Sequence, residues 1–386
     1  MCQFLGFIVM LGLSSIASAT TVDLSFTQDS DGSSADETLT VGSSRTWESV
    51  ATVDGTTIDL QVELVSTDFD GTVETGISDD DLVVYLNESV TDCTGSCQDT
   101  YNAEITYTFL NHDDGSTVSI IPALTIKDID GWTTTDGYEL VSTSLDDLTG
   151  IIINYDTEIE ATPDLSNQLI VLQGLAEHEQ SSAEGAATLT FSSIESFTLD
   201  YTRARGTGTD ISSAFYLDGN VTVDDFYDTP VTYERDDSVY GDVDIEYASS
   251  TEITVSATGA TAEATVSVYV DGTEICDTAA DSSGAWSCDV SDLDEGEHDV
   301  TIYAIIQSST YIYYYGFNDS TAVYTSSSED EETSSSSSAT TETSSSSSDS
   351  SSTAGINVSV STGGSFSYWW LLALPLLTRF RSRKHW

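Results

Sequence analysis

Apolar residues occupy every second position along much of this chain, and this alternation restricts the fold more than any other feature. The segments TEITVSATG (251–259) and AEATVSVYVDG (262–272) place Val, Ile or Ala at alternate positions. A period of two residues is typical of strands with one buried face. Similar alternation recurs between residues 20 and 235, where no amphipathic helical pattern exceeds two turns. The sequence therefore predicts an all-β fold.

Both ends of the chain differ from this strand-rich body. Residues 4–13 are apolar and precede Ala17-Ser18-Ala19, so we expect residues 1–19 to be a signal peptide. Residues 326–354 contain no apolar side chain larger than alanine, which predicts a disordered Ser/Thr-rich linker over 326–362. Such a linker holds the folded part away from the point of attachment.

The last segment, residues 363–386, resembles the GlyGly-CTERM sorting signal. Its parts are Gly363 and Gly364, then an apolar stretch, then a basic cluster at Arg379, Arg381, Arg383 and Lys384. The thirteen residues of 366–378 would form a helix of only about 20 Å, shorter than a bilayer core of ~30 Å. The resemblance implies a short hydrophobic helix in transient contact with the inner membrane, cut by a rhombosortase-like protease. It also implies an exported protein of a Gram-negative bacterium, secreted or held at the cell surface or outer membrane.

Residues 248–325 resemble bacterial Ig-like domains. The resemblance rests on VYVDGTEI, DSSGAW and EGEHDVTIYA, in that order. It implies an Ig-like β-sandwich with Trp286 in its core, and we expect the Asp271-Gly272 and Ser283-Gly284 pairs to form hairpin turns.

Residues 20–235 resemble the lectin-like domain of CshA-type streptococcal adhesins. VATVDG (50–55), DIDG (128–131) and FYLDG (215–219) carry this resemblance. It implies a lectin-like β-sandwich that binds a glycan or an extracellular protein through loops at one end.

Charge and motifs exclude several function classes. The chain has 66 acidic and 9 basic residues, a formal net charge of −57. Such a surface repels nucleic acid and anionic lipid, so we expect neither as a partner of the folded body. No HExxH, G-x-S-x-G or phosphate-loop motif is present. We therefore expect a protein that is not an enzyme and that needs no cofactor.

Four cysteines remain after removal of the signal peptide. Export favours structural disulfides over a metal or redox pair. Spacing favours the pairs Cys93–Cys97 and Cys276–Cys288 among the alternatives, the second across a hairpin.

Aromatic and basic residues supply the candidate ligand contacts. Tyr311, Tyr313 and Tyr315 alternate along one expected strand, and Trp132 follows the DIDG turn. Exposed rings of this kind stack on sugars, although tyrosine is also common in sandwich cores. Two of the five basic residues outside the tail and signal peptide offer an anion contact, or else neutralise neighbouring acids: Arg203 and Arg205.

The DIDG turn also suggests calcium. Asp128 and Asp130 place two carboxylates beside a glycine, and calcium takes about six to eight oxygen ligands. The turn does not complete an EF-hand loop, and Asp-Gly is also a common hairpin turn, so the structural interpretation is favoured. Adhesion through a glycan or extracellular protein is the leading hypothesis. The alternatives are a structural surface-layer or matrix component and a non-catalytic accessory module of a secreted hydrolase system.

Overall fold

The computed structural model describes residues 21–69, 71–87, 100–132, 137–165, 167–204, 213–247, 252–291, 293–294 and 296–324. The expected signal peptide, linker and sorting tail lie outside these residues, as do Cys93, Cys97 and Arg205. Among the helices of the described segments, none is both long and apolar enough to cross a membrane.

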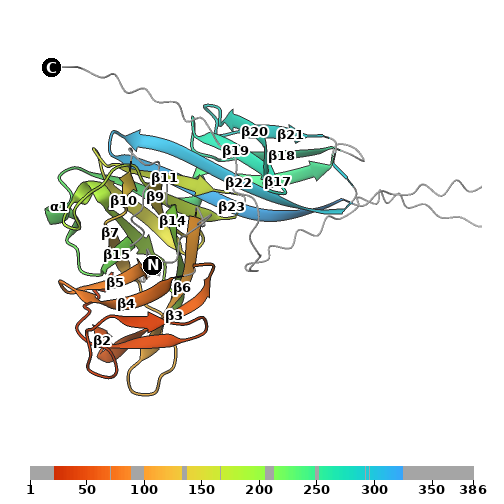
Figure 1. Ribbon diagram of the computed structural model, residues 1–386. Coiled ribbons are helices and arrows are strands. Elements are labelled where there is room, and N and C mark those ends of the chain that lie inside the picture. The colour runs from red at the N-terminus through yellow and green to blue at the C-terminus, as the bar shows by residue number, and fades with distance from the viewer. Residues whose placement is uncertain are drawn as a thin grey trace, which may run out of the picture.

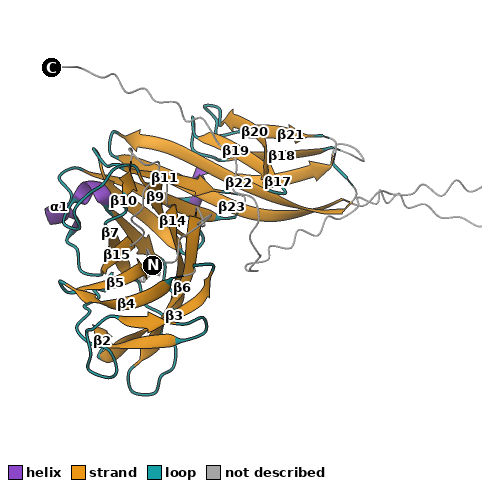
Figure 2. Cartoon of the chain, viewed as in Figure 1, coloured by secondary structure: helices purple, strands orange, loops and turns teal. Residues whose placement is uncertain are grey.

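The described residues are almost entirely β-structure, as predicted (Figure 2). Helical turns are limited, within the described residues, to α1 (Val223–Phe226), η1 (Ala183–Gly185) and η2 (Asp237–Val239).

The strands of the described residues form three sheets. The largest has twelve strands, in the order β1 (Glu37–Leu39), β4 (Thr72–Ser78), β5 (Asp81–Asn87), β15 (Ser213–Asp218), β7 (Ala123–Lys127), β13 (Ala187–Phe191), β10 (Leu148–Asn154), β16 (Pro230–Arg235), β23 (Ile312–Tyr324), β22 (Gly296–Ser309), β19 (Thr265–Val270) and β20 (Thr273–Ala279). The second runs β11 (Ile159–Asp164), β12 (Leu169–Gly174), β9 (Gly137–Ser144), β14 (Ser196–Ala204), β6 (Thr100–Asn111), β3 (Thr56–Thr67) and β2 (Ser44–Val53), with β8 (Gly131–Trp132) beside β9. The smallest runs β17 (Asp242–Tyr247), β18 (Ile253–Thr258) and β21 (Trp286–Val290).

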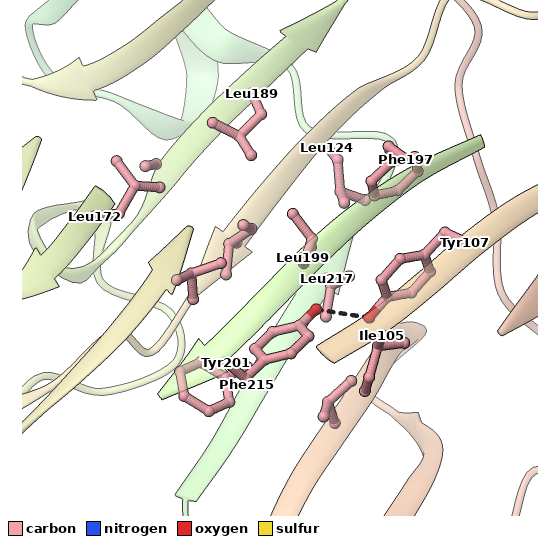
Figure 3. Packing of buried hydrophobic residues seen from close by; sticks show 14 of the residues in the cluster. Ile105, Tyr107, Leu124, Leu172, Leu189, Phe197, Leu199, Tyr201, Phe215 and Leu217 are labelled. Atoms are coloured by element: carbon pink, nitrogen blue, oxygen red, sulfur yellow. Dashed lines mark hydrogen bonds between the residues drawn. The ribbon is translucent and has the colours of Figure 1, made fainter. Parts of the chain in front are cut away.

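The first β-unit is a sandwich in which the second sheet packs against strands β1 to β16 of the largest sheet, in the order given above. Alternate residues of β6 are buried, which is the period-two pattern that the sequence predicts. Figure 3 shows Leu124, Leu189 and Leu217 of the large sheet near Leu199 and Tyr201 of the other. The Tyr201 hydroxyl bonds to that of Tyr107 at 2.6 Å, so both buried polar groups have a partner.

The second β-unit has its own core between the smallest sheet and strands β19, β20, β22 and β23. Trp286 lies in this core, as expected, and its Nε1 donates to the Tyr240 carbonyl at 2.7 Å. The Asp271-Gly272 turn joins β19 to β20 with φ values of 50° and 73°. These left-handed values suit the predicted hairpin turn.

The Cys276–Cys288 disulfide is confirmed, but its expected setting across a hairpin is wrong. Cys276 lies on β20, which pairs with β19, whereas Cys288 lies on β21, which pairs with β18. The bond therefore joins two facing sheets, across a Cα–Cα distance of 6.2 Å. The Ser283-Gly284 turn carries the chain from one sheet to the other, so it is not a hairpin turn.

One strand pair joins the two β-units. Strand β16 pairs with β10 on one side and, in parallel, with β23 on the other. The long β22–β23 hairpin therefore belongs to both units, and Figure 1 shows it running from one to the other. Tyr315 and Phe317 of β23 contribute to the core of the first unit, although they are remote from it in sequence.

Candidate functional site

Two tyrosines lie together on the outside of the molecule where the two β-units meet. Tyr155 follows β10, and Tyr311 lies in the turn between β22 and β23. Their ring centroids are 5.4 Å apart and their planes meet at 81°, an edge-to-face pair. Tyr155 is 55% exposed and Tyr311 is 43% exposed, so a ligand can reach both rings. We call this pair the tyrosine surface.

Hydrogen bonds fix both turns of the tyrosine surface to the segment around β16. The Tyr155 amide donates to the Thr229 carbonyl at 2.8 Å, and the Thr229 amide donates to the Asn154 side chain at 3.0 Å. On the other side, the Thr232 amide donates to the Tyr311 carbonyl at 2.9 Å. Because one short segment holds both turns, the two rings keep a defined separation.

The other tyrosines predicted as ligand contacts are less accessible. Strand β23 begins at Ile312, so Tyr311 lies before it rather than on its face. Tyr313 stacks on Tyr233 with centroids 4.8 Å apart, and both rings pack against the first core. Tyr315 is only 3% exposed, and burial raises its pKa to about 12. The structure thus places Tyr315 in the core, where an outside ligand does not reach it.

The DIDG turn lies at the end of β7, between the two sheets of the first unit. Asp128 has a φ of 66°, a conformation that Asp tolerates better than most residues. Burial, with a smaller effect of the Asp130 charge, raises the pKa of Asp128 to about 7. An Asp130 carboxylate oxygen accepts the His178 amide at 2.8 Å. Trp132 ends β8, whose backbone pairs with β9.

Calcium at Asp128 and Asp130 stays a prediction. Within the described segments, no three side chains of His, Cys, Asp or Glu form a cluster that could hold a metal ion.

A buried ion pair lies beside this turn. Arg203 of β14 and Glu139 of β9 are direct register partners, with Nη1 and Oε1 3.6 Å apart. Their side chains are 5% and 3% exposed. The other Glu139 oxygen accepts the Asp130 amide at 2.9 Å. Arg203 therefore acts inside the protein, and its burial does not suit the predicted contact with an outside anion.

Every lysine or arginine of the described segments has an acidic partner. The pairs are Arg45–Asp29 at 2.8 Å, Lys127–Asp218 at 2.5 Å, Arg203–Glu139 at 3.6 Å and Arg235–Asp237 at 3.0 Å. For Arg203, this arrangement agrees with the second role that the sequence analysis offered, in which the arginine neutralises neighbouring acidic residues.

Sequence reasoning missed Tyr155. It lies in the polar stretch Asn154-Tyr155-Asp156, where a large ring has no strand pattern to bury it. A large aromatic residue between two polar residues is the signal that could have identified Tyr155. Its pairing with Tyr311 could not be predicted in this way, because Tyr311 is distant in the sequence.

Comparisons with known proteins give distant structural likenesses only. No protein-family model matches the chain, and no curated protein matches its sequence. The N-terminal domain of the Streptococcus gordonii adhesin Sgo0707 is similar with a TM-score of 0.36 and 11% identity, covering 77% of this chain and 82% of that one. The adhesin domain of PrgB from Enterococcus faecalis gives a TM-score of 0.32 and 12% identity, covering 50% and 68%. These TM-scores are too low to support an inference about function.

Proposed function

We propose that this protein is an exported, surface-attached adhesin that binds a glycan or an extracellular protein through the tyrosine surface. The observation that carries the proposal is the exposed edge-to-face pair of Tyr155 and Tyr311 on two fixed turns. Rings held in place lose little conformational freedom when a ligand docks. Tyrosine also offers both an apolar face and a hydroxyl, which suits sugar rings and protein surfaces alike.

The charge of the chain narrows the class of ligand. With a net charge of −57, the protein repels anionic polymers, so the ligand is a neutral or basic glycan or a protein with a neutral or basic face. Stacking and hydrogen bonds at the rings are short-range, so moderate salt changes the affinity little.

Export and attachment belong to the same proposal. Residues 1–19 direct export, residues 326–362 form the spacer, and residues 363–386 are removed by a rhombosortase-like protease at the inner membrane of a Gram-negative cell. The two β-units are the folded parts that this anchor presents at the surface.

The test is a glycan and matrix-protein array probed with the full exported chain. We expect selective binding, and we expect the double variant Tyr155→Ser, Tyr311→Ser to lose at least tenfold in affinity. Matched controls are Ile275→Ser and Val41→Ser, because both residues are exposed apolar side chains on other parts of the molecule. Both control variants should bind as the unaltered chain does.

Three outcomes would contradict the proposal. Full binding by the double tyrosine variant would place the ligand elsewhere on the molecule. No selective binding on the array would favour the structural surface-layer role instead, and breakdown of a polymer on the array would favour a hydrolase system.

A further inference from the structure

Three charged side chains meet on three neighbouring strands of the large sheet. Lys127 ends β7, Asp218 ends β15 and Asp81 begins β5, in the strand order β5–β15–β7 (Figure 1). The Lys127 Nζ lies 2.5 Å from Asp218 Oδ2 and 3.1 Å from Asp81 Oδ2. One amine therefore faces two carboxyl groups.

Strand register explains why these side chains meet. Tyr216 pairs with Lys127, so Asp218, two residues further along β15, is the diagonal neighbour of Lys127 on the same face. Leu217 pairs with Leu82, which brings Asp81 opposite Asp218 on the far side. The contact is set by two ladders of hydrogen bonds rather than by flexible loops.

The three groups are largely withdrawn from water. The side chains of Lys127, Asp81 and Asp218 are 12%, 6% and 16% exposed. The Phe226 ring centroid lies 5.7 Å from Nζ, and Gln180 donates to Asp81 at 3.1 Å. Desolvation raises the pKa of Asp81, and the Asp218 charge adds to that rise against the opposing effect of Lys127. Asp81 is thus suited to accept and return a proton.

We propose that Lys127 and Asp218 form an intramolecular amide bond, with Asp81 as the proton carrier. Asp81 takes one proton from the Lys127 ammonium, and the free amine attacks the Asp218 side-chain carbonyl carbon. A C–N bond forms, and the carbonyl electrons move to oxygen. One Asp218 oxygen then leaves as water, taking the proton that Asp81 returns and a second proton from the nitrogen. An ammonium and a carboxylate give one amide and one water, so atoms and charge balance without an oxidant or co-reactant.

Geometry and burial favour this reaction over a permanent ion pair. Two groups fixed in contact by strand register react as if at very high concentration. Exclusion of water stabilises the neutral amide relative to the buried charges. The product ties β7 covalently to β15 in the interior of the large sheet and leaves Asp81 with its bond to Gln180.

The test is the mass of the purified, reduced, denatured chain. The amide makes the chain lighter by one water than its sequence requires, and an unmodified mass for the unaltered protein would overturn the proposal. Because Asp218 precedes Gly219, a cyclic imide at that Asp-Gly step would give the same mass. A digest should therefore show the Lys127 peptide joined to the Asp218 peptide. A digest in which the Lys127 peptide is joined to the Asp81 peptide, or to no other peptide, would also overturn the proposal.

Variants separate the roles of the three residues. Lys127→Arg and Asp218→Ala should each have full mass and no joined peptides, and Asp81→Ala should form the bond slowly or not at all. The exposed control Asp277→Asn should still lose one water. Water loss in Lys127→Arg would count against the proposal, as would complete bond formation in freshly made Asp81→Ala. None of these readouts requires the adhesin function to be correct.

Discussion

Tyr233 and Tyr313 stack face to face where β16 of the first unit meets β23 of the hairpin that both units share, with ring centroids 4.8 Å apart and planes 15° apart. The two residues are also direct partners in the parallel ladder. The stack therefore joins two segments that are 80 residues apart in the chain.

The first prediction concerns the energy of this stack. In a double-mutant cycle with Tyr233→Ala and Tyr313→Ala, we expect a coupling free energy of about 1 kcal/mol, because aromatic pairs contribute beyond their buried area. Chemical denaturation of the full chain measures it. Tyr233→Ala combined with Tyr85→Ala is the matched control, because Tyr85 lies on the distant strand β5 and should add independently. A coupling no larger than in the control would contradict the prediction.

The second prediction concerns the disulfide between the facing sheets. The double variant Cys276→Ala, Cys288→Ala should lose about 3 kcal/mol of stability in the second unit, because the unfolded chain is no longer constrained by a loop closed over 12 residues. Hydrogen exchange over residues 252–324 should report the loss, with residues 100–132 much less affected. A reductant should reproduce the effect in the unaltered protein and change nothing further in this region of the variant. Equal exchange in both proteins would show that the two sheets hold together without the bond.

Local patterns in the sequence predicted much of the local structure. The resemblance to Ig-like domains implied that Trp286 lies in a core, as it does. Alternation identified the strands, and Asp271-Gly272 identified a hairpin turn. These features depend on residues close together in the chain, where side-chain period and turn geometry are decisive.

Long-range pairing could not be read in the same way. The parallel contact of β16 with β23 joins strands that are distant in the sequence, and no local pattern encodes it. For the same reason, Tyr315 is in the core while Tyr311, four positions earlier, is exposed. The sheets of Cys276 and Cys288 were misassigned because adjacent strands in a sequence need not pair.

The third prediction concerns pH and His298. Its Nδ1 lies 2.7 Å from Asp271 Oδ2 and its Nε2 lies 2.8 Å from the Asp294 carbonyl oxygen. Both partners accept hydrogen bonds, so the doubly protonated ring fits best. The bond to Asp271, followed by that to Asp294, raises the pKa of His298 above its usual 6.5. The stabilisation is complete below the unfolded pKa and is lost as pH rises through the folded pKa.

The free energy of unfolding should therefore fall as the pH rises from about 6 to 8. Asp271 is half exposed, so screening limits the effect to about 1 kcal/mol. His298→Gln should remove this part of the pH dependence, as measured by denaturant titrations at both pH values. His112→Gln is the control, because its ring is 41% exposed and should contribute less. An unchanged pH profile in His298→Gln would contradict the assignment.

The fourth prediction concerns the buried pair of Glu139 and Arg203. Burial raises the pKa of Glu139 to about 8, against the opposing effects of the Asp130 amide and the Arg203 charge. A carboxyl with a raised folded pKa contributes stability below its unfolded pKa, and that contribution is lost as pH rises through about 8. Arg203→Met removes the nearby cation, so ionisation of Glu139 becomes more costly still.

We therefore expect Arg203→Met to destabilise the protein more at pH 9 than at pH 5, reaching about 3–5 kcal/mol where Glu139 must ionise without its partner. Glu139→Gln removes the titrating carboxyl and leaves Arg203 charged at both pH values, so its cost relative to the unaltered protein should shrink as the pH rises from 5 to 9. The double variant Glu139→Leu, Arg203→Met should recover much of the loss, since apolar side chains of similar volume need no desolvation of charge. Arg235→Met is the control for a more exposed pair and should cost about 1 kcal/mol with little change between the two pH values. Denaturant titrations of all four variants supply the comparison, and an Arg203→Met penalty equal at pH 5 and pH 9 would show that Glu139 does not titrate in this range.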